Sequence, residues 1–285
     1  MRAILIGISA LLLTACGGAS MPNTQDEPKV PESPIPENPS QNPSTKNKIE
    51  SDSSWFLQLQ GTVDLTKPVE LYEVDLFDTS TQNISQLKNR GVQVICYFSA
   101  GSYEDWRDDK NAFHSADLGK NLDGWAGENW LDIRSENVRS IMKKRIELAK
   151  EKGCSGIDPD NVDGYSNNTG FNLTAQDQLS YNRFLADTAH KNNLVIALKN
   201  DLNQIQELEP YFDLSVNEQC QFYDECHLLK PFKENNKLII NIEYDDSFLA
   251  SNTNKAKLCQ TAKDNGLQTK VLTIELDGEE RFSCF

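Results

Sequence analysis

The sequence has few of the groups that several common functions require. It holds 28 Lys and Arg against 43 Asp and Glu, for a net charge of −15. Without a basic stripe to replace phosphate counterions, we expect no nucleic-acid binding. Only three histidines occur, His114, His190 and His227, they are scattered, and no CxxC pair is present. A zinc site is therefore not expected.

Two sequence motifs are also missing. No GxSxG elbow occurs, because "GYSNN" lacks the final glycine, and this disfavours serine hydrolase chemistry. The first apolar segment leads into "GTVDLTKPVE" instead of a glycine-rich phosphate loop, which disfavours dinucleotide binding. We expect no cofactor and no metal.

The chain begins with "MRAILIGISALLLTAC", which has one positive charge, a mostly apolar run and small residues before Cys16. This pattern is typical of a secretory signal peptide, too short to span a bilayer. Because "LTAC" resembles a bacterial lipobox, we expect residues 1–15 to be a lipoprotein signal and Cys16 to carry the lipid. An ordinary signal peptide is the alternative. The expected location is the outer membrane, on its periplasmic or cell-surface face.

Residues 16–54 hold seven of the eleven prolines and almost no large apolar side chain. Such a segment cannot bury a core, so we expect a disordered Pro-rich tether that reaches on the order of 100 Å. From Trp55 onward, apolar runs alternate with charged amphipathic stretches.

Disulfides are expected in an exported protein with an even number of cysteines. With Cys16 set aside, six remain: Cys96, Cys154, Cys220, Cys226, Cys259 and Cys284. Sequence proximity favours pairing Cys220 with Cys226, and the adjacency of predicted strands favours Cys96 with Cys154. Cys259 and Cys284 are then left for each other.

Eight apolar segments predict strands over residues 55–61, 70–78, 92–101, 154–160, 194–201, 212–219, 238–246 and 270–276. Amphipathic patterns between several of them predict helices, one capped by Ser135 and ended by Gly153, one capped by Thr174, and one ended by Gly266. This α/β rhythm favours a (β/α)8 TIM barrel over residues 55–285, with a doubly wound sheet as the competitor.

The active site of such a barrel lies at the carboxyl ends of its strands, where this sequence gathers acids, amides and aromatics. The candidate ligand-binding residues are Asp75, Tyr97, Tyr103, Trp106, Trp125, Glu128, Lys199, Asn200, Asp201, Asn217 and Glu243. Carboxylates with flat rings suit a carbohydrate, and hydrolysis of a glycosidic bond needs two carboxyl groups. We expect that pair to be Asp158 or Asp160 together with Glu218.

At some of these positions a purely structural role competes with a catalytic or binding role. Asp163 is better explained as a turn cap than as a catalytic group, and Lys199 could be a simple ion-pair partner. Each tryptophan could be a core residue under a long loop. "DPDNVDG" begins like an EF-hand, but Val162 occupies the fifth position and Asp163 the sixth, where glycine is required.

Several long motifs, in order, resemble glycoside hydrolase family 114: "CYFSAGSYEDWRDD", "GENWLDIR", "GCSGIDPDNVDGY", "IALKND", "VNEQC" and "NIEY". The resemblance implies an endo-α-1,4-polygalactosaminidase on a barrel, with Asp158, Asp160 and Glu218 as its essential acids. It does not say which aspartate is primary. We expect Asp158 to act as nucleophile or stabiliser and Glu218 as proton donor.

A polymer of partly deacetylated galactosamine carries ammonium groups, which an acidic protein would attract. We therefore expect a cationic amino-sugar polysaccharide as the partner of a monomeric chain that is held at the membrane through Cys16. Two alternatives stay open, a barrel that binds the polymer without cleaving it and an enzyme for a different glycan.

Overall fold

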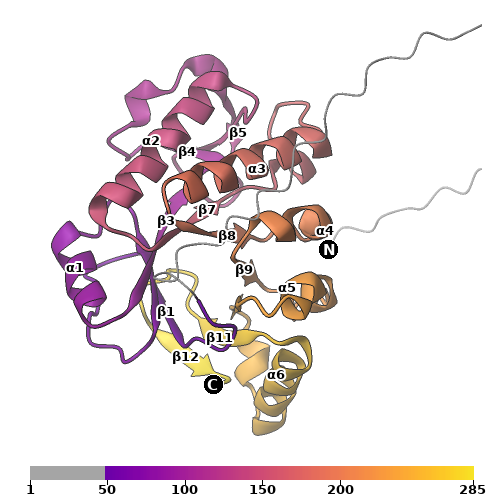
Figure 1. Ribbon diagram of the computed structural model, residues 1–285. Helices are drawn as coiled ribbons and strands as arrows, with labels where there is room; N and C mark the ends of the chain where they lie inside the picture. Colours follow the sequence, from indigo (N-terminus) through magenta and orange to yellow (C-terminus); the bar gives the residue numbers. More distant parts are fainter. Residues whose placement is uncertain (1–48) are drawn as a thin grey trace, which may run out of the picture. The chain divides into compact units, whose positions relative to one another are not determined.

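The computed structural model describes residues 49–285, which fold around a nine-stranded sheet (Figure 1). The lipobox, Cys16 and most of the predicted tether lie outside this range. Eight parallel strands follow one another in chain order, and an antiparallel ninth pairs with the eighth. They are β1 (Trp55–Gln58), β2 (Leu71–Asp75), β3 (Gln93–Ser99), β7 (Gly156–Asp160), β8 (Val195–Lys199), β9 (Leu214–Glu218), β10 (Ile239–Glu243), β11 (Gln268–Leu272) and β12 (Glu280–Ser283).

The sheet curls until its first strand lies beside its last parallel strand. The Trp55 indole N–H of β1 donates to Gln268 O of β11 at 3.1 Å, and Lys270 Nζ of β11 donates to Trp55 O at 2.7 Å. Beyond the strand ends, Leu59 N donates to Leu276 O at 2.8 Å. The predicted α/β fold is confirmed as a TIM-barrel-like architecture with all eight expected parallel strands.

The helices surround the strands (Figure 1), and their set is less regular than the (β/α)8 pattern predicts. Residues 49–285 contain six α-helices, two of them very short: α1 (Thr81–Asn89), α2 (Glu136–Lys152), α3 (Ala175–Lys191), α4 (Ile205–Leu208), α5 (Lys230–Glu234) and α6 (Asn252–Asn265). The connection from β1 to β2 holds no helix. Short 3-10 turns extend α4 and α5.

The predicted helix ends are confirmed. Ser135 Oγ accepts from the backbone N–H of Val138, and Gly153 ends α2 with a φ of 89°, which favours glycine. Thr174 and Asp177 form a reciprocal capping box at the start of α3, so each side chain satisfies a backbone donor of the first turn.

The apolar core has two layers because each parallel strand is covered on both faces. Side chains inside the barrel form one cluster, which includes Leu57, Ile95, Val216 and Ile240. The other cluster lies between the strands and the helices. Near-continuous apolar runs in the sequence follow from this double burial. All three expected disulfides, Cys96–Cys154, Cys220–Cys226 and Cys259–Cys284, are confirmed.

A small antiparallel sheet interrupts the connection from β3 to α2. Its strands are β4 (Ser102–Glu104), β5 (Leu118–Asn121) and β6 (Glu128–Leu131), with β6 in the middle. The sequence did not predict it, because strands of three or four residues are too short to show a period. Glu128 of β6, and Trp106 and Trp125 in the loops of this sheet, are the predicted residues that it contributes to the barrel mouth. None of the helices in residues 49–285 has both the length and the apolar content to cross a membrane.

Candidate active site

A cleft of about 610 Å³ opens at the carboxyl ends of the parallel strands. Two cations line it, Arg107 and Lys199, against ten carboxyl groups: Glu73, Asp75, Asp78, Glu104, Asp123, Glu128, Asp160, Asp163, Glu218 and Glu275. Both cations are already paired with carboxylates. The excess negative charge therefore favours a cationic ligand.

Lys199 ends β8 at the centre of the cleft and joins two acids from the strands on either side. Its Nζ lies 3.0 Å from Asp160 Oδ1, at the end of β7, and 3.1 Å from Glu218 Oε2, at the end of β9. Those two oxygens contact one nitrogen, so they cannot lie farther apart than the sum of the two distances, about 6 Å. Lys199 itself is only 6 % exposed.

Asp160 is held in its ionised form. Tyr97 Oη donates to Oδ2 at 2.9 Å, and the backbone N–H of Asn161 donates to Oδ1 at 2.8 Å. Burial on its own would raise the pKa of Asp160, but the charge of Lys199 and these hydrogen bonds outweigh burial and lower the pKa below its ordinary value. The group is therefore a carboxylate across the neutral range.

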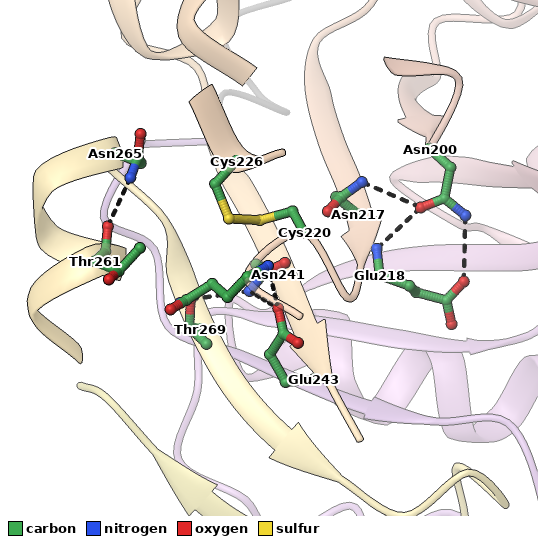
Figure 2. Close-up of a disulfide and its surroundings, with 11 residues drawn as sticks. Asn200, Asn217, Glu218, Cys220, Cys226, Asn241, Glu243, Thr261, Asn265 and Thr269 are labelled. Carbon is green, nitrogen blue, oxygen red and sulfur yellow. Dashed lines mark hydrogen bonds between the residues drawn. A yellow bond between two sulfur atoms is a disulfide. The ribbon is translucent and has the colours of Figure 1, made fainter. Parts of the chain in front are cut away.

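Glu218 is fixed by the neighbouring strands. Tyr244 Oη, just beyond β10, donates to Oε1, and Asn200 Nδ2, just beyond β8, donates to Oε2 at 3.3 Å. The Asn200 carbonyl oxygen also accepts from the Glu218 backbone N–H at 2.9 Å. Figure 2 shows Asn200 facing Glu218 through both contacts.

The backbone is strained where these strands end. The residues directly after β7, β8 and β9 are Asn161, Asn200 and Gln219, with φ values of 60°, 49° and 61°. Such conformations cost on the order of 1–3 kcal/mol each and concentrate at functional sites. Asn161 also approaches Gly101 so closely that a Cβ there would lie 1.6 Å from Asn161 O. These turns aim Asp160, Lys199 and Glu218 at one point.

Asp158 lies below this centre and does not face the cleft. It is 0 % exposed, and in residues 49–285 neither of its oxygens accepts a hydrogen bond from a backbone N–H or from a basic, amide or hydroxyl side chain. Its neighbour is the buried carboxyl of Glu73, and burial raises the pKa of both groups, that of Asp158 to about 7. Two desolvated acids side by side favour a shared proton. We therefore revise the expectation that Asp158 is the nucleophile or stabiliser, because a ligand cannot reach it.

A buried ion-pair network supports one wall of the cleft. Arg107 pairs with Asp75 at 2.7 Å and with Glu104 at 2.8 Å, and its guanidinium stacks over Phe77. Arg145 of α2 lies 3.5 Å from Glu104. Asp75 also caps the turn after β2 by accepting from the Phe77 N–H. Its role in the structure is to hold the wall in place.

The small antiparallel sheet and its loops also supply aromatic and acidic residues to the cleft lining. Trp106 is 50 % exposed and Trp125 is 47 % exposed, so both rings are available to a ligand. Glu128 is buried and accepts from Ser102 Oγ at 2.5 Å. Burial raises the pKa of Glu128 to about 7.

Comparison with known families identifies the chain. The model of glycoside hydrolase family GH114 matches residues 36–284. The chain belongs to this family. A comparison with curated proteins returned no match.

Two solved structures show how far the GH114 likeness extends. The crystal structure of Aspergillus fumigatus Ega3 in complex with galactosamine shares 39 % sequence identity, covering 82 % of this chain and 96 % of that one, with a TM-score of 0.78. The glycoside hydrolase domain of PelA from Pseudomonas aeruginosa shares 13 % identity over 80 % of this chain and 96 % of that one, with a TM-score of 0.60. The second likeness shows the fold alone.

The GH114 cleft brings together most of the residues predicted from sequence. Besides Asp160 and Glu218, those that line it are Asp75, Tyr97, Trp106, Trp125, Glu128, Lys199 and Asn200. Lys199 does pair with carboxylates, as the alternative interpretation held, but both of its partners are the candidate acids themselves.

Besides Asp158, four predicted residues lie outside the cleft lining. Asn217 and Glu243 point away from the barrel interior, because side chains alternate along a strand and Glu218 and Tyr244 take the inward positions. Asp201 is buried against Asn182 of α3. Tyr103 packs edge-to-face on Phe113, with ring centroids 5.5 Å apart.

Among the GH114 cleft residues that were missed in the sequence, four take part in the contacts described above. Tyr244 follows the strand ending "NIE" and lies two positions after Ile242. Alternate residues of a strand face the same side, so the inward direction of Tyr244 could have been predicted from the apolar Ile242. Glu73 has the same parity as Asp75 within one strand. Glu104 and Arg107 lie in the "SYEDWRDD" loop, whose local pattern gives no signal that they form a buried pair.

Proposed function

We propose that this chain is an endo-acting hydrolase of an α-1,4-linked galactosamine-type polysaccharide, with Asp160 and Glu218 as its catalytic acids. The observation that carries the proposal is the shared Lys199 ammonium, which places both carboxylates at one point in an open cleft. Glycoside hydrolysis needs this arrangement of two carboxyl groups around one bond.

The two acids take different roles because their surroundings differ. Asp160, whose pKa is lowered, stays ionised and attacks the anomeric carbon. Glu218, held by Tyr244 and Asn200, enters the reaction as the protonated acid and gives its proton to the glycosidic oxygen as the bond from that oxygen to the anomeric carbon breaks. Glu218 then takes a proton from water, which displaces Asp160 from the sugar. The bound of about 6 Å between Asp160 Oδ1 and Glu218 Oε2 fits a retaining enzyme better than an inverting one.

The substrate is assigned on charge and on the family. The Ega3 structure contains galactosamine, and the carboxylates of the cleft, which outnumber its two cations, suit the ammonium group of that sugar. Trp106 and Trp125 would cover the apolar faces of sugar rings. Attraction between exposed charges weakens with salt, so hydrolysis of a deacetylated polymer should fall with ionic strength while hydrolysis of the fully acetylated polymer should not.

The place of action is inferred from the sequence. We propose that residues 1–15 are removed, that Cys16 carries a lipid, and that residues 16–54 tether a monomeric barrel to the outer membrane. Metabolic labelling with a radioactive fatty acid tests the lipid, since Cys16→Ser should abolish incorporation. Incorporation that survives this substitution would refute it.

A product-size assay tests the reaction. The chain is incubated with purified galactosamine, glucosamine and N-acetylated polymers, and the products are sized over time. We expect mid-sized fragments from the galactosamine polymer at early times and none from Glu218→Gln, which should keep its affinity. A native chain that binds the polymer without shortening it would show a binding protein instead.

A further inference from the structure

A short loop that follows Glu218 exposes two aromatic rings. We name residues 219–226, "QCQFYDEC", the aromatic loop. Phe222 is 48 % exposed and Tyr223 is 60 % exposed, while their ring centroids lie 5.0 Å apart at a right angle. Adjacent, large and exposed apolar side chains of this kind commonly mark a binding surface.

The aromatic loop is held rigidly. The Cys220–Cys226 disulfide closes its base, and within it the Tyr223 N–H donates to Gln219 O at 3.0 Å. The Gln221 N–H donates to Glu243 Oε1 at 2.9 Å, which fixes the loop to the end of β10. In Figure 2 the Glu218 and Asn200 pair is drawn to the right of the disulfide, and the Glu243 and Asn241 pair below it. The rings are therefore presented at little further cost in conformational entropy.

The aromatic loop continues the surface of the cleft without being part of its lining. Its first residue, Gln219, adjoins Glu218, and the hydrogen bond from the Tyr223 N–H to Gln219 O at 3.0 Å keeps Tyr223 close to that end of the loop. Phe222 and Tyr223 are absent from the residues that line the cleft. A polymer chain leaving the cleft past Glu218 would meet them next.

The negative charge of the aromatic loop also suits a polysaccharide that carries ammonium groups. Asp224 and Glu225 follow the two aromatics, and the loop contains no lysine or arginine. The face of a sugar ring can stack on an aromatic ring, and an ammonium group on that sugar can pair with a neighbouring carboxylate. A protein partner fits less well, because two side chains supply only a small part of the 1,200 Å² that a stable interface buries.

We propose that the aromatic loop is a polysaccharide-binding subsite outside the cleft, which holds the polymer on the Glu218 side of the cleaved bond. This inference rests on the proposed function for the identity of the polymer. It also assigns Glu243 a positioning role, since its carboxylate holds the loop.

The test compares long and short substrates with the full chain. The variant is Phe222→Ala with Tyr223→Ala, and the control is Phe285→Ala, which removes an equally exposed ring near the start of β1. We expect the ratio of kcat/KM for long galactosamine polymer to kcat/KM for short oligomers to fall about tenfold in the variant, mainly through KM. The control should keep the native ratio.

Binding is measured separately by affinity electrophoresis through galactosamine polymer, with all chains carrying Glu218→Gln. The double variant should migrate less retarded than the parent. An unchanged ratio together with unchanged retardation overturns the subsite. If the native chain cleaves no polymer but the double variant still loses retardation, the proposed reaction fails while the subsite stands. If the parent is not retarded and the native chain cleaves no polymer, both fail.

Discussion

Asp160 and Glu218 both contact a single ammonium group, that of Lys199, at 3.0 Å and 3.1 Å. They come from β7 and β9, which are separated by the whole of α3 and β8 along the chain. The fold brings the two acids together, and the positive charge of Lys199 offsets the repulsion between them. Without that charge, two carboxyl groups so close would favour sharing a proton. The central chemistry of the site depends on this three-residue arrangement.

Replacing Lys199 should disable the enzyme. In Lys199→Met we expect kcat/KM on galactosamine polymer to fall by at least about 100-fold. The ammonium lowers the pKa of Asp160, so its loss should move the acidic limb of the pH profile to higher pH. Lys143→Met, at an exposed position on α2, is the control. A native pH profile in Lys199→Met would show that Lys199 does not tune the acids.

The two aspartates of β7 should be separable by kinetics. In Asp160→Asn we expect kcat to fall by about 10⁴-fold with substrate affinity retained, because the group proposed to attack is lost. Asp158→Asn leaves the cleft surface intact and should cost only about 10-fold. Steady-state kinetics, with circular dichroism to check the fold, distinguish them. Equal losses, or the reverse order, would restore Asp158 as the primary acid.

Glu128 should make stability depend on pH. Its pKa is raised from 4.5 to about 7 in the folded chain, so between these values the folded state holds a proton that the unfolded state releases. The stability that this group contributes is therefore lost as the pH rises through that window. Glu128→Gln removes this titration. As the pH rises through the window, its free energy of unfolding should therefore increase relative to that of the native chain, by up to about 3 kcal/mol.

Urea denaturation at about pH 5 and about pH 8 measures this effect. Glu151→Gln, at an exposed position on α2, is the matched control and should show no such trend. A difference in unfolding free energy that stays flat with pH, or that shrinks as the pH rises, would contradict the buried state of Glu128.

The disulfides should differ in their contribution to stability. Cys96–Cys154 closes 58 residues and Cys220–Cys226 closes only 6. In the chain-entropy model, loss of the first costs about 4 kcal/mol and loss of the second about 2 kcal/mol. Paired Cys→Ala variants in thermal unfolding would test this order. A larger loss from the short loop would mean that native contacts outweigh chain entropy.

Local patterns in the sequence predict much of this fold. The eight parallel strands could be found because strands buried on both faces give apolar runs bounded by turns. Ser135, Gly153, Thr174 and Asp177 mark their helix ends because capping depends on a few neighbouring residues. Once the sequence is divided into strands and helices in this way, Asp160, Lys199 and Glu218 fall at strand ends.

Long-range packing could not be predicted in the same way. The Arg107 network joins β2 to an inserted loop 30 residues later, and no local period records that pairing. Asn217 and Glu243 are excluded from the cleft because the other set of alternate residues in each strand faces the barrel interior. The sequence shows which set faces inward only when one inward residue is known.

The stereochemistry of the first product tests the two-carboxylate account most directly. Proton NMR of galactosamine oligomers during cleavage by the chain would reveal the anomer that forms before mutarotation. Because Asp160 Oδ1 and Glu218 Oε2 lie no more than about 6 Å apart, the account predicts the α-anomer, with the configuration of the cleaved bond retained. Initial release of the β-anomer would show that water attacks the sugar directly, and it would contradict the assignment of Asp160 as the nucleophile.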